Sequence, residues 1–291
     1  MPFPYLGETK ELNDETRQEG RGSFVRLSNG ITHYELGNPE RENTVVLIHG
    51  FSVPYFIYDP TFDFLVQSGF RVLRYDLFGR GYSDRPRARY DIDLFVRQLE
   101  DLIEALRFTR PLSLIGLSMG GPIAATFTAR HPHRVHKLVL IDPAGARPIP
   151  LSPLLNLAKV PLLAEILFGL VGSGELAKAA ASDFFDPTWV EHFISKYKVQ
   201  MQFKGFIRAI LSTIRSGMLN SFIETYRSVG ESGTPVLLLW GRDDKTVPLE
   251  HSRDLQAAMP QAKLRIIENC GHIPHYERPE AVNPILLEFL K

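Results

Sequence analysis

The sequence predicts an α/β fold, with a mainly parallel central sheet, helices on both faces and an inserted helical cap. Short β-branched runs alternate with longer segments of helical periodicity, which is typical of parallel strands joined by crossover helices. The run at 44–48 is continuously apolar, as expected for a strand buried on both faces. The alternation stops between residues 147 and 230, where helix follows helix, and then resumes. We therefore expect a helical insertion over one end of the sheet.

The elements follow one another in a regular order. Ser28-Asn29-Gly30 carries the Asn-Gly signal of a hairpin turn between strands at 23–27 and 31–35. Further strands are expected at 44–48, 70–75, 112–117, 135–141, 235–240 and 264–267. Helices are expected at 91–108, 119–130, 250–258 and 279–290. This order divides the chain into a core segment at 1–146, a cap at 147–230 and a second core segment at 231–291.

Composition narrows the class of protein. The 291 residues include 33 basic and 33 acidic side chains, so the chain has no net positive charge with which to bind nucleic acid. The single cysteine, Cys270, excludes an internal disulfide and argues against a cysteine-based metal site. The N-terminal residues lack the basic start and apolar centre of a signal peptide, which favours a cytoplasmic protein. Pro153, Lys159 and Pro161 interrupt the apolar stretch at 151–171, so we expect amphipathic helices there and no stable membrane insertion.

The candidate nucleophile is Ser118. Gly116-Leu117-Ser118-Met119-Gly120 fits the pattern G-x-S-x-G, follows the expected strand at 112–117 and opens a helix. The sharp strand-to-helix turn requires glycine on both sides and lifts the hydroxyl clear of the sheet. The helix N-terminus there favours developing negative charge. The alternative interpretation is a plain glycine-rich turn.

Activation of a serine requires a base and an acid that orients it. His272 follows the last strand and is the candidate base, with His275 as its rival. Asp244 follows the strand at 235–240 and is the candidate acid, with Asp243 and Asp142 as alternatives. Ser118, Asp244 and His272 therefore stand in the chain order nucleophile, acid, base.

An oxyanion hole needs two backbone donors. Met119 directly follows the nucleophile, and Phe51 lies in the loop after the strand at 44–48. Their N–H groups are the predicted pair. Asp76 and Arg80, in the loop after the strand at 70–75, are interpreted as residues that fix that loop. The predicted chemistry uses no metal or cofactor.

Five segments carry a resemblance to a known family: 49–51, 76–83, 116–121, 241–248 and 271–274. They resemble the α/β-hydrolase superfamily over nearly the whole chain except the insertion, which would correspond to the family's cap or lid. In that family the second aspartate of Gly-x-Asp-Asp-x-x-x-Pro carries the acid role, which supports Asp244 over Asp243. Similar haloalkane dehalogenases and epoxide hydrolases carry aspartate at the position of Ser118, so the resemblance implies acyl transfer.

The resemblance leaves two serine-dependent branches. Ser118-Met119-Gly120-Gly121 is shared by carboxylesterases, monoacylglycerol-lipase-like enzymes and the carbon–carbon hydrolases of aromatic-ring degradation. The last group typically has Asn before the serine and Trp after the histidine, where this chain has Leu117 and Ile273. Both departures favour a carboxylesterase, with the carbon–carbon hydrolase as the alternative. A catalytically silent binding module on this fold has no need of all three catalytic groups.

The cap should set the specificity. Its leucine-rich first part has more apolar surface than one helix face can bury, so part of it is expected to contact an apolar acyl chain of a small-molecule ester. Leu167, Phe168 and Ile273 are the candidate substrate contacts. Packing of the cap against the core is the alternative fate of the same side chains. The sequence carries no signal for an oligomeric state.

Overall fold

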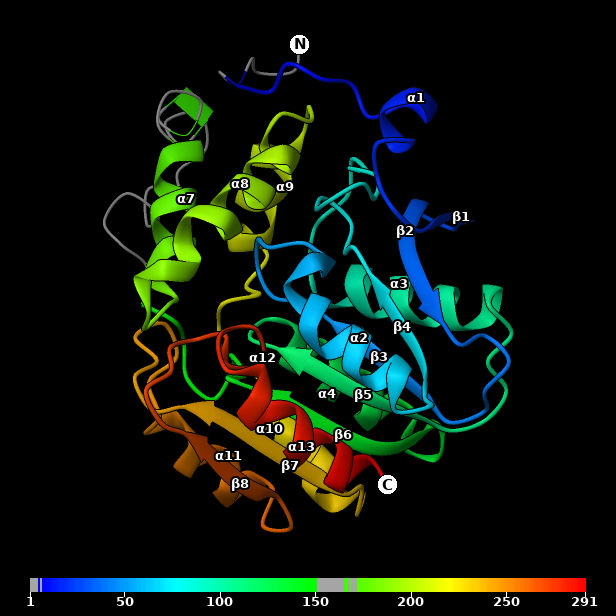
Figure 1. Cartoon of the computed structure of the whole chain (residues 1–291), viewed down its shortest axis with the longest axis vertical. Coiled ribbons are helices and arrows are strands. Elements are labelled where there is room, and N and C mark those ends of the chain that lie inside the picture. The colour runs from blue at the N-terminus through cyan, green and yellow to red at the C-terminus, as the bar shows by residue number, and fades with distance from the viewer. Residues whose placement is uncertain (1–4, 6, 151–164, 167, 169–171) are drawn as a thin grey trace.

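An eight-stranded sheet forms the centre of the molecule (Figure 1). A computed structural model describes residues 5, 7–150, 165–166, 168 and 172–291. In order across the sheet, the strands are β1 (Ser23–Leu27), β2 (Gly30–Gly37), β4 (Arg71–Tyr75), β3 (Thr44–Ile48), β5 (Leu112–Leu117), β6 (Val135–Ile141), β7 (Val236–Gly241) and β8 (Lys263–Ile267). The pairs β1–β2 and β2–β4 are antiparallel and the remaining pairs are parallel. The predicted α/β fold with a mainly parallel sheet is therefore confirmed.

Helices cover both faces of the sheet (Figure 1). One layer contains α3 (Ile92–Ala105), α4 (Gly120–Arg130), α10 (Ile223–Glu231) and α11 (His251–Ala258). The other contains α2 (Asp59–Gln67), α12 (Pro274–Glu277) and α13 (Pro279–Leu290). Successive side chains of a strand point to opposite faces, so Val46 and Leu114 join one hydrophobic cluster while Val45 and Ile115 join the other. Burial on both faces explains the continuous apolar run of β3.

Helix α2 is absent from the sequence-based expectations. It begins beside Pro60, which suits the first turn of a helix because proline lacks an N–H that would be unbonded there anyway. It has only nine residues, so its apolar residues span too few turns for a clear period. Short 3₁₀ turns at Tyr55–Tyr58, Pro132–Arg134 and Pro187–Trp189, and the N-terminal helix α1 (Asp14–Arg17), were likewise not predicted.

The inserted helices lie over the end of the sheet at which β5, β6 and β7 finish (Figure 1). They are α7 (Ser173–Ser182), α8 (Val190–Met201) and α9 (Phe206–Arg215). The predicted insertion also included the residues of α10, but α10 packs against α4 and α11 and so belongs to a layer of the sheet. No helix of the described ranges is long and apolar enough to cross a membrane, and most of the 151–171 stretch lies outside them.

Candidate active site

The turn between β5 and α4 holds Ser118 in a conformation that few side chains adopt. Its φ angle is +50°, in the left-handed region. A Cβ atom on Gly116 would lie 2.4 Å from the carbonyl oxygen of Gly120, and one on Gly120 would lie 2.2 Å from that of Ile48. The turn is therefore closed to any residue but glycine at these two positions. The backbone carbonyl of Ser118 accepts from Gly121 at 2.8 Å, which anchors the turn to the helix.

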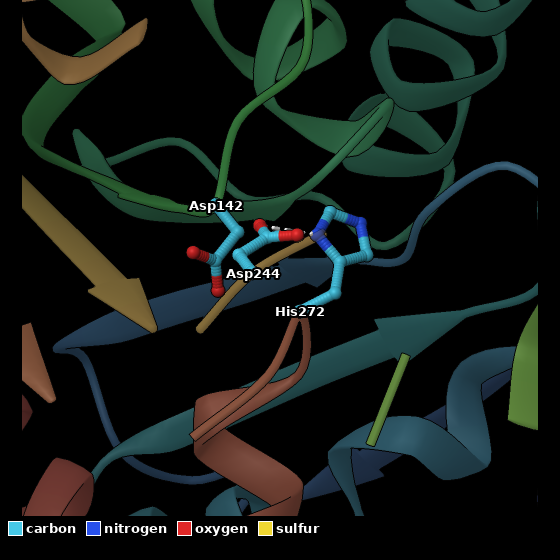
Figure 2. Close-up of side chains that lie close together, drawn as sticks. All are labelled: Asp142, Asp244 and His272. Atoms are coloured by element: carbon cyan, nitrogen blue, oxygen red, sulfur yellow. Dashed lines mark hydrogen bonds and ion pairs between the residues drawn. The ribbon is translucent and has the colours of Figure 1, made fainter. Parts of the chain in front are cut away.

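His272 and Asp244 form a buried pair (Figure 2), and His272 lines the same cavity as Ser118. The Nδ1 atom of His272 lies 2.7 Å from Oδ2 of Asp244. The other oxygen of Asp244 accepts the backbone N–H groups of Thr246 and Val247, each at 2.8 Å. The loops after β7 and β8 thus bring together the two residues that the sequence analysis assigned as acid and base. Because Nδ1 points to the carboxylate, Nε2 is the ring nitrogen left to exchange a proton.

The rival residues lie elsewhere. Asp243 is exposed, and its backbone N–H donates to the carbonyl of Cys270. His275 is fully buried with its ring centroid 4.6 Å from that of Tyr58, and it is not among the described residues that line the cavity at Ser118. Burial, reinforced by the charge of His272, lowers the pKa of His275 to about 3. The carboxylate on Nδ1 of His272 is thus that of Asp244 and not that of Asp243, and His272 rather than His275 lines the cavity with Ser118.

Asp142, the third candidate acid, lies directly beside Asp244 (Figure 2). It directly follows β6, is fully buried and has a φ angle of +41°. Its Oδ1 atom accepts the N–H of Gly241 at 2.9 Å, while Oδ2 has no hydrogen-bond partner within the described residues. Burial and the neighbouring charge of Asp244 raise the pKa of Asp142 well above its usual range. The ligand atoms of Asp142, Asp244 and His272 lie within 4.8 Å of one another, as in a metal site, but the 2.7 Å separation of Nδ1 and Oδ2 is that of a hydrogen bond.

The acidic surroundings control the basicity of His272. Burial lowers its pKa, but the charge of Asp244, the hydrogen bond to Asp244 and the charge of Asp183 outweigh burial and raise the pKa to about 9. Asp183 follows α7, accepts the backbone N–H of His272 on its carbonyl at 2.8 Å, and accepts the hydroxyl of Thr246 on its carboxylate at 2.7 Å. Burial raises the pKa of Asp183 itself. The imidazolium form is therefore strongly favoured at this position.

The predicted oxyanion donors belong to two segments that meet at Ser118: Met119 follows it in the turn, and Phe51 follows Gly50, where an added Cβ would lie 3.2 Å from Cβ of Ser118. The N–H groups of Phe51 and Met119 have no acceptor within the described part of the chain. Phe51 is held through its carbonyl, which accepts Nε of the fully buried Arg80 at 2.8 Å. Arg80 also donates from Nη2 to the hydroxyl of Thr213 in α9 at 2.9 Å. The inserted helices therefore support the loop that carries Phe51.

Asp76 and Arg80 organise loops, as the sequence analysis interpreted them. Asp76 accepts the backbone N–H groups of Tyr55 and Tyr82 at 2.9 Å each and pairs with His33. Burial alone would raise the pKa of Asp76, but these donors and the histidines outweigh it and lower the pKa.

Ser118 and His272 open into one cavity of about 600 Å³ between the sheet and the inserted helices. Its apolar lining from the core includes Leu117, Phe51 and the candidate substrate contact Ile273. Phe168 is instead buried in the hydrophobic cluster beneath the inserted helices and is not among the described lining residues. Leu167 lies outside the described residues. The structure thus places Phe168 in packing, the alternative considered for the cap.

Sequence reasoning missed two inserted residues that border the site. Asp183 lines the cavity beside His272. Gln200 in α8 donates to the carbonyl of Ser52 at 2.7 Å and accepts the N–H of Gly81 at 2.9 Å. The dipeptide Asp186-Pro187 signals a break after α7 and marks a loop there. No sequence signal shows that this loop folds back onto the site.

Comparison with known proteins identifies the family. A family model described as alpha/beta hydrolase fold matches residues 43–279. A Cupriavidus pinatubonensis protein named 2-hydroxy-6-oxononadienedioate/2-hydroxy-6-oxononatrienedioate hydrolase is 27% identical over 288 residues, covering 94% of this chain and 96% of that protein.

Two solved structures share the fold. The meta-cleavage product hydrolase CumD of Pseudomonas fluorescens IP01 is similar with a TM-score of 0.75 and 24% identity, over 92% of this chain and 97% of that one. A thermophilic esterase of Thermogutta terrifontis is similar with a TM-score of 0.74 and 23% identity, over 92% and 98%. Because the family model spans most of its length, the chain belongs to the alpha/beta hydrolase fold family.

Proposed function

We propose that the chain is a serine hydrolase in which Ser118 attacks a carbonyl carbon, His272 transfers the proton and Asp244 orients His272. The observation that carries this proposal is the 2.7 Å pair of His272 and Asp244 at the cavity that also holds the Ser118 turn. A buried carboxylate on Nδ1 fixes the ring so that Nε2 accepts a proton, which is the role of the acid in a catalytic triad.

The proposed reaction has two steps. The Ser118 oxygen adds to the carbonyl carbon as His272 takes its proton, and the oxyanion accepts from the N–H groups of Phe51 and Met119. The bond to the leaving group breaks, and His272 protonates that group. Water then adds to the acyl-enzyme with His272 again taking the proton, and the released products are a carboxylic acid and free Ser118. Every proton removed by His272 returns to a product or to Ser118.

A carboxylic ester is the first candidate substrate. The two residues that flank the catalytic serine and histidine, Leu117 and Ile273, are apolar and line the cavity, which favours an apolar acyl or alkyl group there. The carboxylate of Asp183 borders the same cavity near His272. Its negative charge disfavours a second carboxylate on the substrate at that point.

A vinylogous diketone is the second candidate, and the comparisons favour it over the ester. The Cupriavidus relative is named as a hydrolase of 2-hydroxy-6-oxononadienedioate, and the structurally similar CumD is a meta-cleavage product hydrolase. In this case the bond that breaks joins the attacked carbonyl carbon to a carbon atom, and the proton from His272 goes to that carbon. The acyl-enzyme and the three catalytic residues are the same.

Parallel assays separate the candidates. The hydrolysis of p-nitrophenyl esters from acetate to palmitate and the bleaching of a coloured ring-fission product are measured with the native chain and with Ser118→Ala. Ester turnover that peaks at one chain length and disappears in the variant supports the esterase. Bleaching without ester turnover supports the carbon–carbon hydrolase. Turnover that persists in folded Ser118→Ala contradicts the whole proposal.

A further inference from the structure

Two carboxyl groups meet behind His272, although the proposed triad uses only one. Asp142 follows β6 and Asp244 follows β7, so neighbouring parallel strands bring them to the same edge of the sheet. Figure 2 shows the two carboxyl groups side by side, with Asp244 between Asp142 and the imidazole. Both are buried, with 0% and 5% of their surface exposed, so water does not screen one charge from the other.

Hydrogen bonding decides which of the two carries the negative charge. Asp244 accepts from three donors, which are the N–H groups of Thr246 and Val247 and Nδ1 of His272. Asp142 accepts from one, the N–H of Gly241, and its Oδ2 atom has no partner among the described residues. Donors stabilise an ionised carboxylate, and an ionised neighbour destabilises a second one. The proton of the pair therefore resides on Asp142.

Apart from His272, which is paired with Asp244, the described groups around Asp142 offer no compensating positive charge. The described groups that face it are Asp244, Asp183 and the thiol of Cys270, whose pKa is raised by burial and by Glu277 and Asp142. His272 lies on the far side of Asp244, and His275, which faces His272, has its pKa lowered by burial. A second buried anion would thus stand among acidic groups.

We propose that Asp142 is a positioning residue for the triad: as a neutral carboxylic acid it donates its Oδ2 proton to the Asp244 carboxylate and holds that carboxylate against His272. The inference rests on the proposed function, since it assigns Asp142 a role only through Asp244 and His272. A neutral donor on Asp244 disperses part of its charge and so limits how far Asp244 raises the basicity of His272.

Asparagine provides a matched replacement for the neutral acid. In Asp142→Asn the side-chain oxygen can still accept from Gly241 and the amide can still donate to Asp244, and asparagine tolerates the left-handed φ of this position. We expect kcat/KM and the midpoint of its pH profile to be unchanged. Asp142→Ala removes the donor, so kcat should fall about tenfold, as for the loss of one hydrogen bond, and the midpoint should move to higher pH.

The pH profiles of these two variants, measured on the substrate that the native chain turns over, test the inference. A shifted midpoint or a loss of more than about tenfold in folded Asp142→Asn would overturn it, because a charged Asp142 is the group that asparagine cannot replace. Infrared spectra provide a test without turnover. A C=O band of a protonated carboxyl group at neutral pH should be present in the native chain and absent from Asp142→Asn, and a native chain without that band also overturns the inference.

Ser118→Ala and His272→Ala distinguish a failure of the proposed function from a failure of the role proposed for Asp142. If they retain turnover, the proposed function fails. If they are inactive, the result with Asp142→Asn bears on Asp142 alone.

Discussion

His33 and His272 each lie with Nδ1 2.7 Å from Oδ2 of a buried aspartate, which is Asp76 for the first and Asp244 for the second. The pairs differ at the other ring nitrogen. Nε2 of His33 lies against the carbonyl oxygen of Arg21, so both ring nitrogens of His33 contact oxygen atoms of the protein. Nε2 of His272 has no such acceptor within the described residues, and the side chain lines the cavity with Ser118.

The comparison shows that an aspartate–histidine pair alone does not make a catalytic site. The ring of His33 is also stacked between Phe24 and Tyr55, with centroids 4.7 and 4.8 Å away. The His33–Asp76 pair links β2 to the loop after β4, so we interpret its role as structural. The pair at His272 differs because Nε2 has no acceptor within the described residues and the side chain lines the cavity that Ser118 also lines.

The largest expected difference between the two pairs is in turnover. His272→Ala removes the proposed base and should lower kcat/KM by roughly 10⁶-fold, as for the loss of a triad base. His33→Ala should leave the kcat of the folded protein unchanged, because His33 does not border the cavity. Steady-state kinetics of both variants on the same substrate check this. Equal losses in the two variants would contradict the catalytic role of His272 and the structural role of His33.

Replacement of the acid should have the second largest effect. Asp244→Asn keeps the volume but removes the charge that holds the His272 tautomer, and kcat should fall by roughly 10⁴-fold. Asp243→Asn, one residue earlier and exposed, is the matched control and should retain native kinetics. A greater loss in the Asp243 variant would mean that the assignment of the acid is wrong.

The His33 pair should instead show its effect in folding. His33→Ala leaves the buried carboxylate of Asp76 without one of its donors, which should lower the free energy of unfolding by about 2–4 kcal/mol. Urea denaturation followed by circular dichroism measures this loss. The idea that this pair is structural fails if His33→Ala is as stable as the native chain.

The smallest effect should come from the inserted helices. The negative charge of Asp183 contributes to the raised pKa of His272, and His272 acts as a base only after losing its proton. In the native chain kcat/KM should therefore rise with pH through a midpoint above 6.5, toward about 9. Asp183→Asn removes a charge that stabilises the imidazolium, so the midpoint should move to lower pH. A midpoint that stays in place or rises would show that Asp183 does not act on His272.

Sequence patterns predicted the parts of the molecule that depend on local rules. Burial on both faces produces a continuous apolar run such as β3, and the tight turn at Ser118 requires its two glycines, so the sheet and this turn could be predicted from the sequence. The loops after β7 and β8 could also be predicted from the order of the strands along the chain. Among the strand-end aspartates, only packing distinguishes Asp244 from Asp142, because both stand at the same edge of the sheet.

The remaining features depend on how distant segments pack. The amphipathic pattern of α10 predicts a helix but does not say that its partners are α4 and α11. Asp183 reaches His272 only because the segment after α7 folds back over the loop that follows β8. His33 gives no local sign of its pairing with Asp76, which is 43 residues away.

Labelling of the nucleophile tests the central claim most directly. The folded protein is incubated with a fluorophosphonate, digested, and analysed by mass spectrometry, with Ser118→Ala and His272→Ala alongside. The proposed mechanism predicts one adduct, on the peptide that contains Ser118, its absence from Ser118→Ala and strongly slowed formation in His272→Ala. A folded native chain that takes no label, or an adduct on another residue that persists in Ser118→Ala, would contradict the assignment of Ser118 as an activated nucleophile.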